Sequence, residues 1–235
     1  MKVLMIIPAY NEEENILNTV KSIKNYKKVK LDYVVINDGS KDNTKKVLED
    51  NNINYINLCN NLGIGAAVQT GYKYAYYNNY DIAIQYDGDG QHDINYVNRL
   101  IDGISKDKYD MVIGSRFVGH ESEFKSTMAR RIGIKLISII IKIFTKKRIL
   151  DTTSGYRAVN KELIEEFAKN YVFDYPEPIS SMKILKKGYK VNEIPVNMLE
   201  RKFGVSSINF HKSIYYMLNV CLTLILIGIG GSKND

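Results

Sequence analysis

Cysteine is scarce in this sequence of 235 residues, which holds two and no C-x-x-C pair. Cys59 and Cys221 lie far apart in apolar settings, which argues against a structural zinc site and for a reducing compartment. Uninterrupted apolar runs of 18 residues, the length expected of a membrane-spanning helix, are also missing. The N-terminus reaches Pro8 and polar Asn11 too soon to hold the apolar core of a signal peptide. We therefore expect the chain to stay on the cytoplasmic side.

Acidic residues are absent from residues 124–150, although the whole chain carries 26 of them. Eight cations alternate there with aliphatic residues: Lys125, Arg130, Arg131, Lys135, Lys142, Lys146, Lys147 and Arg148. We therefore expect residues 117–150 to form a basic amphipathic segment suited to a membrane interface with anionic headgroups. The alternative is a helix that packs on the core and keeps a solvated basic face. No segment resembles a module that reads or stacks bases, so a nucleic-acid partner is not expected.

A second apolar segment spans residues 213–231. At 1.5 Å per residue, about 17 residues extend roughly 25 Å, which is short for a membrane crossing. We expect an interfacial or re-entrant helix here, with a plain core helix as the alternative.

The remaining composition is that of a globular protein, with 45% hydrophobic and 25% charged residues. In the first half of the chain, apolar runs alternate with segments of helical spacing. Strands are predicted at 3–9, 33–37, 55–58, 82–86 and 111–113, and helices at 12–24, 44–48, 65–77 and 96–105. Such alternation predicts an open, mostly parallel sheet with helices on both faces, an α/β Rossmann-like fold. We expect this domain over residues 1–210 and an apolar, membrane-associated helix over 211–235.

Two carboxylates stand one residue apart in Asp87-Gly88-Asp89, directly after an apolar strand. Residues i and i+2 of a strand point to the same face, so these side chains are expected to project together. They repel each other unless a cation lies between them, and hard oxygen ligands of this kind suit Mg²⁺ or Mn²⁺. Gln91 offers a further oxygen. The alternative is a solvated Asp-Gly turn that closes a hairpin.

Polar clusters follow four of the predicted strands, at residues 8–12, 37–40, 87–92 and 114–116. In an open parallel sheet, ligands bind outside the carboxyl ends of the strands. Because all four clusters belong to such ends, the sequence predicts a ligand site along one edge of the sheet.

Five segments occur in order along the chain: Pro8-Ala9-Tyr10-Asn11-Glu12, Asn37-Asp38-Gly39-Ser40, Asn61-Leu62-Gly63, Asp87-Gly88-Asp89-Gly90-Gln91-His92 and Gly114-Ser115-Arg116. Their order and spacing resemble a family-2 glycosyltransferase of the dolichyl-phosphate mannosyltransferase-like group, over roughly residues 1–210. The resemblance implies the A-type nucleotide-diphospho-sugar transferase fold. It also implies an inverting reaction that needs Mg²⁺ or Mn²⁺.

The resemblance implies roles for individual residues on the donor side. The nucleotide-binding candidates are Pro8, Tyr10, Glu12, Asp38, Asp87 and Arg201. The metal candidates are Asp87, Asp89 and Gln91, whose cation would neutralise the charge of the leaving diphosphate. His92 is left without a role. The chain departs from the mannosyltransferases at Ser207, where they carry a lysine that contacts the diphosphate, and Lys202 is the candidate replacement.

On the acceptor side, the resemblance implies that Arg116, Arg130 and Arg131 hold a lipid phosphate. The planar guanidinium suits this role because it binds phosphate with two hydrogen bonds. The candidate catalytic residues are Asp89, Arg116 and Glu177. A phosphate acceptor is already ionised and needs no base, whereas a sugar hydroxyl would make Glu177 or Asp174 the candidate general base. The alternative for Glu177 is favourable charge at a helix N-terminus.

The predicted function is transfer of a sugar from a GDP- or UDP-sugar to a polyprenyl phosphate or lipid-linked glycan, in cell-surface polysaccharide or glycoconjugate synthesis. We expect a peripheral or weakly anchored enzyme on the cytoplasmic face of the membrane, where a partner membrane protein would complete its attachment. One alternative is a nucleotidyltransferase, although the glycine-rich basic loop typical of that class is missing after the first strand. Another is a non-catalytic protein that binds sugar nucleotides or acts as a scaffold.

Overall fold

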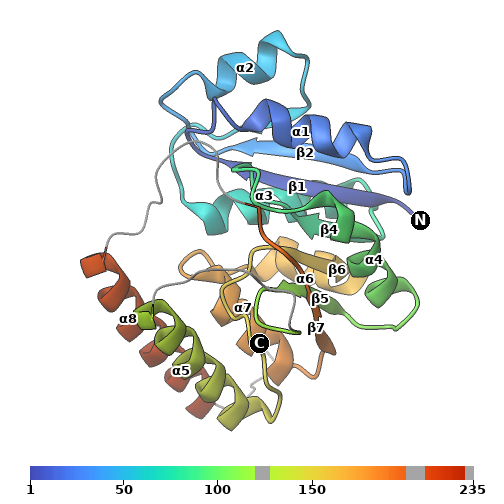
Figure 1. The fold of residues 1–235 in the computed structure, drawn as a ribbon. Coiled ribbons are helices and arrows are strands. Elements are labelled where there is room, and N and C mark those ends of the chain that lie inside the picture. Colours follow the sequence, from blue (N-terminus) through green and yellow to red (C-terminus); the bar gives the residue numbers. More distant parts are fainter. Residues whose placement is uncertain (120–127, 200–209, 231–235) are drawn as a thin grey trace.

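The structure, a computed structural model, describes residues 1–119, 128–199 and 210–230. Within these residues, seven strands form one sheet in the order β3-β2-β1-β4-β6-β5-β7 (Figure 1). The strands are β1 (Val3–Ala9), β2 (Asp32–Asn37), β3 (Tyr55–Asn57), β4 (Ile82–Gln85), β5 (Met111–Ser115), β6 (Arg157–Asn160) and β7 (Val191–Pro195). Every neighbouring pair is parallel except the two that include β6. The predicted mostly parallel sheet is therefore confirmed.

Burial on both faces explains why the central strands are continuously apolar. All seven residues of β1 are buried, and their side chains alternate between two cores. Met5 and Ile7 enter one core, whereas Leu4 and Ile6 enter the other. Burying an aliphatic side chain of this size stabilises the fold by roughly 1.5–3 kcal/mol, so this strand anchors both sides of the sheet.

Helices cover both faces of the sheet (Figure 1). They are α1 (Ile16–Asn25), α2 (Thr44–Asp50), α3 (Ile64–Tyr77), α4 (Val97–Ser105), α5 (Met128–Thr145), α6 (Lys161–Asn170), α7 (Pro176–Lys186) and α8 (Phe210–Ile229), with a 3₁₀ turn at Ile94–Tyr96. Helices α1, α2 and α4 contribute to the core on one face, and α3 and α6 to the core on the other.

A third apolar cluster joins α5, α7 and α8 beside the sheet. Its buried members are Ile137, Ile140, Ile141, Ile179, Met182, Val220 and Leu224. Two close approaches hold α5 and α8 together: Gly133 lies against Met217 near their N-terminal ends, and Gly228 lies against the ring of Phe144 near their C-terminal ends. The two helices therefore run parallel and side by side. No helix in the described part of the chain has the length and apolar character needed to cross a membrane.

The expected first-half elements are all present; the first strand has the predicted ends, and each of the others has at least one shifted end. Helix α1 begins at Ile16 rather than Glu12, because Asn11 takes a left-handed conformation and the carbonyl of Glu12 accepts the N–H groups of Asn15 and Ile16 in a turn. Strands β6 and β7 and helix α6 were not predicted. The reversed direction of β6 places the segment before that strand, rather than after it, at the functional edge of the sheet.

Candidate active site

The carboxyl ends of the parallel strands lie along one edge of the sheet, as the sequence predicts. Strands β1, β2 and β4 pair in parallel there and end at Ala9, Asn37 and Gln85. Strand β5, which ends at Ser115, has the same direction because β6 is antiparallel to both β4 and β5. The four predicted polar clusters are therefore brought to one edge.

The loops after β1 and β2 are joined by hydrogen bonds. The N–H of Asn11 donates to Ser40 Oγ at 3.0 Å, and the N–H of Lys41 donates to Asn11 Oδ1 at 2.8 Å. Next to them Tyr10 is partly exposed, with 38% of its surface accessible, so its ring is available to a ligand. Pro8 is buried within β1, where its carbonyl accepts the N–H of Gly88. The structure thus places Tyr10 on the surface of this site and Pro8 beneath it.

Two acidic residues of these loops are buried and already hydrogen-bonded. Asp38 receives the N–H of Leu62 at 2.8 Å and that of Gly63 at 2.9 Å, one on each carboxylate oxygen. It thereby fixes the turn that precedes α3. Glu12 accepts a hydrogen bond from Asn15 Nδ2 at 2.7 Å. Both carboxylates shape the loops that border the edge.

Asp87 follows β4 and is held by two neighbours whose contacts with it were not predicted, His92 and Gln85. His92 Nε2 lies 3.1 Å from its Oδ2, and Gln85 Nε2 donates to its Oδ1 at 3.3 Å. His92 is buried, and its ring stacks on Tyr156 with centroids 4.6 Å apart. Burial alone would raise the pKa of Asp87, but His92, the bond from Gln85 and the charge of Arg116 together lower it. Asp87 is thus kept ionised and oriented.

Asp89 and Gln91 lie in the turn after Asp87. Asp89 Oδ1 accepts the N–H of Gln91 at 3.0 Å, and the carbonyl of Gln91 accepts the N–H of Leu199 at 2.8 Å. No cluster of three or more His, Cys, Asp or Glu side chains forms a complete metal cage in the described residues. Two carboxylates and an amide oxygen on one loop nevertheless fit Mg²⁺ or Mn²⁺, which commonly takes one or two protein carboxylates and completes its shell with phosphate and water.

Arg116, at the end of β5, forms a buried two-pronged pair with Asp151. Its Nε and Nη2 donate to the two carboxylate oxygens, each at 2.7 Å, and Nη2 also donates to Thr153 Oγ1 at 2.8 Å. The guanidinium lies over the ring of Phe117, with 5.6 Å to the centroid. Glu193 of β7 stabilises the backbone at Asp151, because its carboxylate accepts the N–H of Asp151 at 2.8 Å.

Segment 151–157 connects this pair with Asp87. A side chain at Gly155 would place its Cβ 2.9 Å from Asp87 Oδ2, so any other residue here would displace the end of the Asp87 side chain. Arg157 is fully buried and donates to the carbonyls of Ser154 at 2.7 Å and Glu177 at 2.9 Å. Burial raises the pKa of Glu177, and Asp87 adds to the effect, while Arg157 and a bond from Gln85 oppose it. Glu177 and Asp87 are therefore neighbours that share Gln85.

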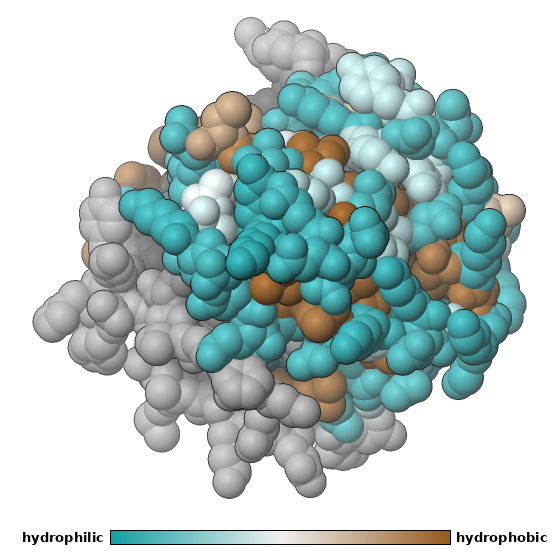
Figure 2. Space-filling view, turned by 90° about the horizontal axis from the view of Figure 1, so that it is seen from above, coloured by the Kyte–Doolittle hydropathy of each residue, from teal (hydrophilic) through white to brown (hydrophobic). Residues whose placement is uncertain are grey.

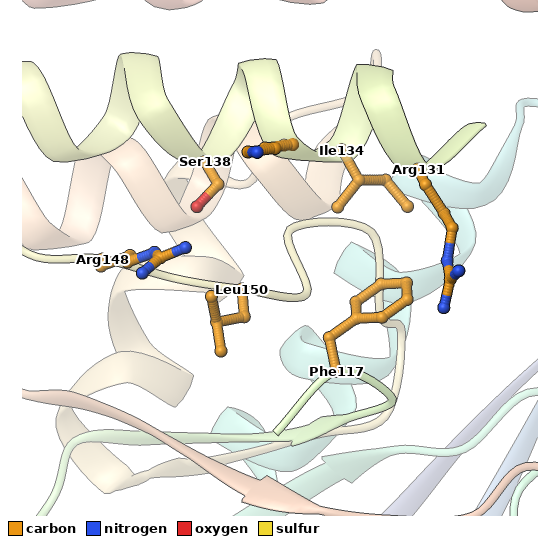
Figure 3. A pocket seen from close by; sticks show the side chains of 7 residues that line it. Phe117, Arg131, Ile134, Ser138, Arg148 and Leu150 are labelled. Carbon is orange, nitrogen blue, oxygen red and sulfur yellow. The ribbon is translucent and has the colours of Figure 1, made fainter. Parts of the chain in front are cut away.

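A pocket of about 170 Å³ opens between α5 and the loops that carry the Arg116–Asp151 pair (Figure 3). Its apolar walls are Phe117, Ile134 and Leu150, and its polar lining is Arg131, Lys135, Ser138 and Arg148. Arg131 and Arg148 lie at opposite ends in Figure 3, with Phe117 and Leu150 between them. The pocket combines positive charge with apolar surface, which suits an anionic head on a hydrocarbon chain.

Most sequence-predicted residues meet at this edge. Arg116 lies close enough to Asp87 to affect its pKa, Asp89 and Gln91 share the turn after Asp87, and Arg131 lies in the adjoining pocket. Only the backbone of Arg130 is described, within α5, and Arg201 lies outside the described residues, as do Lys202 and Ser207. Asp174 is exposed. Gln85 and Glu193 were missed as contributors, His92 was left without a role, and Arg148 was named only as one of the cations of residues 124–150; the position of Gln85 at the end of a strand was a signal that could have found it.

Comparisons with known proteins agree with this geometry. A family model described as Glycosyl transferase family 2 matches residues 5–167. The chain is 31% identical over 224 residues to UDP-N-acetylglucosamine–dolichyl-phosphate N-acetylglucosaminyltransferase of Methanococcus voltae, covering 87% of this chain and 88% of that protein. It is 26% identical over 220 residues to polyprenol monophosphomannose synthase of Mycolicibacterium smegmatis, covering 88% and 81% respectively.

Among solved structures, the fold is similar to glucosyl-3-phosphoglycerate synthase of Mycobacterium tuberculosis, in complex with Mn²⁺, UDP-glucose and phosphoglyceric acid. The TM-score is 0.70, and the alignment covers 99% of this chain and 81% of that one. At 15% identity the likeness concerns the fold alone. It confirms the predicted nucleotide-diphospho-sugar transferase fold.

Proposed function

The chain belongs to glycosyl transferase family 2 and is a glycosyltransferase, and from that premise we propose that it transfers a sugar from a nucleotide diphosphate to a polyprenyl phosphate. Relatives named for dolichyl-phosphate and polyprenol substrates support the acceptor class. The donor is a UDP- or GDP-sugar. The reaction takes place at the cytoplasmic face of the membrane and serves the synthesis of cell-surface glycans.

The donor nucleotide binds along the loops after β1 and β2, beside Tyr10, and Arg201, outside the described residues, is the candidate contact for its diphosphate. Asp87, Asp89 and Gln91 are the residues that would hold a divalent cation, which would neutralise the charge of the departing diphosphate. His92 and Gln85 keep Asp87 ionised and oriented for this purpose. Preorganised charges of this kind act where negative charge develops, and they need no reorganisation during the reaction.

The acceptor phosphate binds in the basic pocket under α5. An oxygen of this phosphate attacks the anomeric carbon, the bond from that carbon to the donor diphosphate breaks, and the nucleoside diphosphate leaves with the bonding electrons. Because the phosphate is already an anion, no proton has to be removed. Arg131 and Arg148 hold the head, and Phe117, Ile134 and Leu150 contact the first isoprene units.

One observation carries this proposal: the Arg116–Asp151 pair stands between the Asp87 loop and the basic pocket. Thr153, which accepts a hydrogen bond from Arg116, lies two residues before Gly155, and Gly155 lies against Asp87. Phe117 and Leu150, the sequence neighbours of Arg116 and Asp151, line the pocket. Arg116 also helps to lower the pKa of Asp87, so the positive charge of Arg116 acts on the donor side of the site. A donor at Asp87 and a phosphate in the pocket would therefore meet across Arg116.

The test has a donor arm and an acceptor arm. Thermal shifts with UDP, GDP and dTDP are recorded with and without Mn²⁺, since binding raises apparent stability by mass action. Asp89→Ala should abolish the Mn²⁺-dependent part of the shift. Turnover is then measured as nucleoside diphosphate release with a short-chain polyprenyl phosphate, where Arg131→Ala should raise the acceptor KM by tenfold or more and leave the donor KM unchanged.

The matched control is Lys142→Ala, which removes an exposed cation from the same helix outside the pocket lining. It should leave both KM values at their wild-type level. Tight nucleotide binding without turnover on any donor would instead favour the non-catalytic sugar-nucleotide-binding protein, and an undiminished shift in Asp89→Ala would refute the metal assignment.

A second candidate is transfer to a sugar hydroxyl with Glu177 as general base. The raised pKa of Glu177, caused by its burial and by Asp87, favours it because a base works best when its pKa approaches the working pH. Glu177→Gln distinguishes the two reactions. It should leave turnover on a polyprenyl phosphate largely intact, whereas a hydroxyl acceptor would lose two to four orders of magnitude, on the order of a general-base contribution.

A further inference from the structure

Helix α5 presents aliphatic side chains to solvent on the side opposite its core contacts. Ile132, Leu136, Ile139 and Ile143 are all exposed, by 46–63%. Their spacing of four, three and four residues makes one continuous stripe along the helix. The buried Ile137 and Ile141 lie on the opposite side, within the third apolar cluster. The exposed stripe is therefore not part of the protein's own core.

Helix α8 carries a matching stripe. Leu218, Leu222, Leu226 and Ile229 are exposed by 58–73%, while Val220 and Leu224 are buried on the other side of the helix. Because α5 and α8 run side by side and share one cluster with α7, both exposed stripes point away from that cluster. We call these two stripes the outer face. By contrast, the side over α1 and α2 is mainly hydrophilic, with aliphatic residues in small patches (Figure 2).

Cations lie along the edge of the outer face. Arg131, Lys135 and Lys142 follow a spacing of four and seven residues, beside the aliphatic stripe of α5, and all three are exposed. Lys146 and Lys147 extend the charge beyond the end of the helix. Neither α5 nor α8 contains an acidic residue. An apolar strip bordered by cations alone is complementary to a bilayer with anionic headgroups, where acyl chains meet the strip and phosphates meet the cations.

The attachment of α8 fixes its orientation. The ammonium of Lys186, on α7, donates to the carbonyls of Ile227 at 2.7 Å, Gly228 at 3.1 Å and Gly230 at 2.7 Å. One side of α8 and its C-terminal end are thereby committed to the globular part. A helix surrounded by lipid could not make these contacts, whereas a helix that lies in the plane of the interface exposes only one side to the acyl chains.

We propose that the outer face of α5 and α8 docks in the plane of an anionic bilayer and brings the basic pocket to headgroup level. Arg131 and Lys135 line that pocket and also border the outer face, so a lipid phosphate enters it without leaving the interface. The role of the pocket rests on the proposed function, but the docking does not.

The test measures flotation of the full chain with vesicles of phosphatidylcholine, with and without phosphatidylglycerol. Wild type should bind the anionic vesicles more tightly and lose this preference at high salt. The triple variant Leu222→Gln, Leu226→Gln, Ile229→Gln should weaken binding roughly 100-fold. Lys142→Gln with Lys146→Gln should weaken binding to the anionic vesicles by roughly tenfold and spare binding to neutral ones.

The control is Tyr76→Gln with Tyr77→Gln, which removes two exposed aromatic residues from α3 and should leave binding unchanged. All variants should keep the wild-type melting temperature, since every changed side chain is exposed. Turnover on a short-chain acceptor in solution should persist in the triple variant. Vesicle binding without turnover on any donor would refute the proposed function alone.

Wild-type binding by the triple variant would overturn the docking. So would a wild-type protein that ignores vesicles and forms a dimer that the triple variant cannot form, since the outer face would then cover a second copy. Vesicle binding that appears only with an added membrane protein would assign the face to that protein instead.

Discussion

Residues that carry no chemistry of their own set the geometry around Asp87. His92 and Gln85 touch its carboxylate, and Gly155 leaves room for it. His92 is in turn fixed by stacking on Tyr156, whose hydroxyl donates to the carbonyl of Asp93 at 3.0 Å. The orientation of the Asp87 carboxylate thus depends on the buried rings of His92 and Tyr156 and on the absence of a side chain at Gly155.

Gly155→Ala should therefore impair the reaction more than the fold. The new methyl group would lie within 3 Å of Asp87 Oδ2 and Gln85 Nε2, and the ends of those side chains would have to move. A displacement of about 1 Å at such a site costs on the order of 100-fold in turnover. Steady-state rates at saturating donor and Mn²⁺ measure this, alongside the melting temperature. Unchanged rates would show that Asp87 needs no fixed position.

Glu193 makes stability depend on pH in an unusual direction. Burial raises its pKa, and the nearby charge of Asp151 adds to this, although the N–H groups of Leu150 and Asp151 oppose it. The folded protein then holds a proton that the unfolded chain has already released. The contribution of Glu193 is full below the ordinary glutamate pKa and is lost as the pH rises through the raised value.

The stability advantage of wild type over Glu193→Gln should therefore shrink as the pH rises through the mildly acidic range. Chemical denaturation at a series of pH values measures the free energy of unfolding of both proteins. The variant removes this titration and leaves the others, so the difference isolates Glu193. A difference that grows with pH would mean that the pKa is lowered in the folded state.

At the scale of elements, glycines determine how closely α5 and α8 pack. A Cβ at Gly228 would lie 2.5 Å from ring atoms of Phe144. Gly228→Ala should therefore destabilise the protein by about 1–3 kcal/mol, the usual cost of overpacking. Urea unfolding measures the change, with Leu222→Ala on the exposed side of the same helix as the control. Equal stability of the two variants would contradict the close packing.

The elements that the sequence predicted correctly are those with long apolar patterns. Val3–Ala9 is apolar at all seven positions, so its identity as a buried strand was plain. Strand β6 has four residues, one of them Arg157, and β7 contains Asn192 and Glu193 within five. Such strands are stabilised by pairing with distant partners, which no local pattern reveals. Helix α6, capped by Asn160, did carry a readable signal.

In the candidate active site, too, some features follow from local sequence patterns and others depend on distant residues. The order of polar clusters predicted that Asp87, Asp89 and Arg116 would share an edge, because strand direction alone brings them there. The pairing of Arg116 with Asp151, and of Asp87 with His92, depends on side-chain placement within a few ångströms. Residues far apart in sequence decide these contacts, so spacing in the chain could not predict them.

At the scale of the whole molecule, the structure comprises a sheet with two cores and a helical cluster attached to its side. Strand β1 has hydrogen-bonded neighbours on both edges and contributes to both cores. Helix α8 is joined to the rest through the third cluster and the Lys186 contacts. These parts should open with different free energies.

Native-state hydrogen exchange should therefore rank the amides of β1 and β4 as the slowest and those of α8 as faster. The exchange of α8 should slow on anionic vesicles, while that of β1 stays unchanged. Peptide-resolved mass spectrometry provides both measurements. Equal protection of α8 and β1 in the absence of vesicles would indicate one cooperative unit.

Chemical labelling of Lys186, at the end of α7, can report whether α8 is attached to the rest of the protein. An acylating reagent reacts with an amine and not with an ammonium, so Lys186 must leave the three carbonyls to which it donates and lose a proton before it can react. Lys183 and Lys187, on the same helix end, are exposed. Their labelling rates therefore serve as an internal standard. The ratio of Lys186 to its neighbours reports how often the helix detaches, and a reagent that acylates Lys186 would trap the detached state.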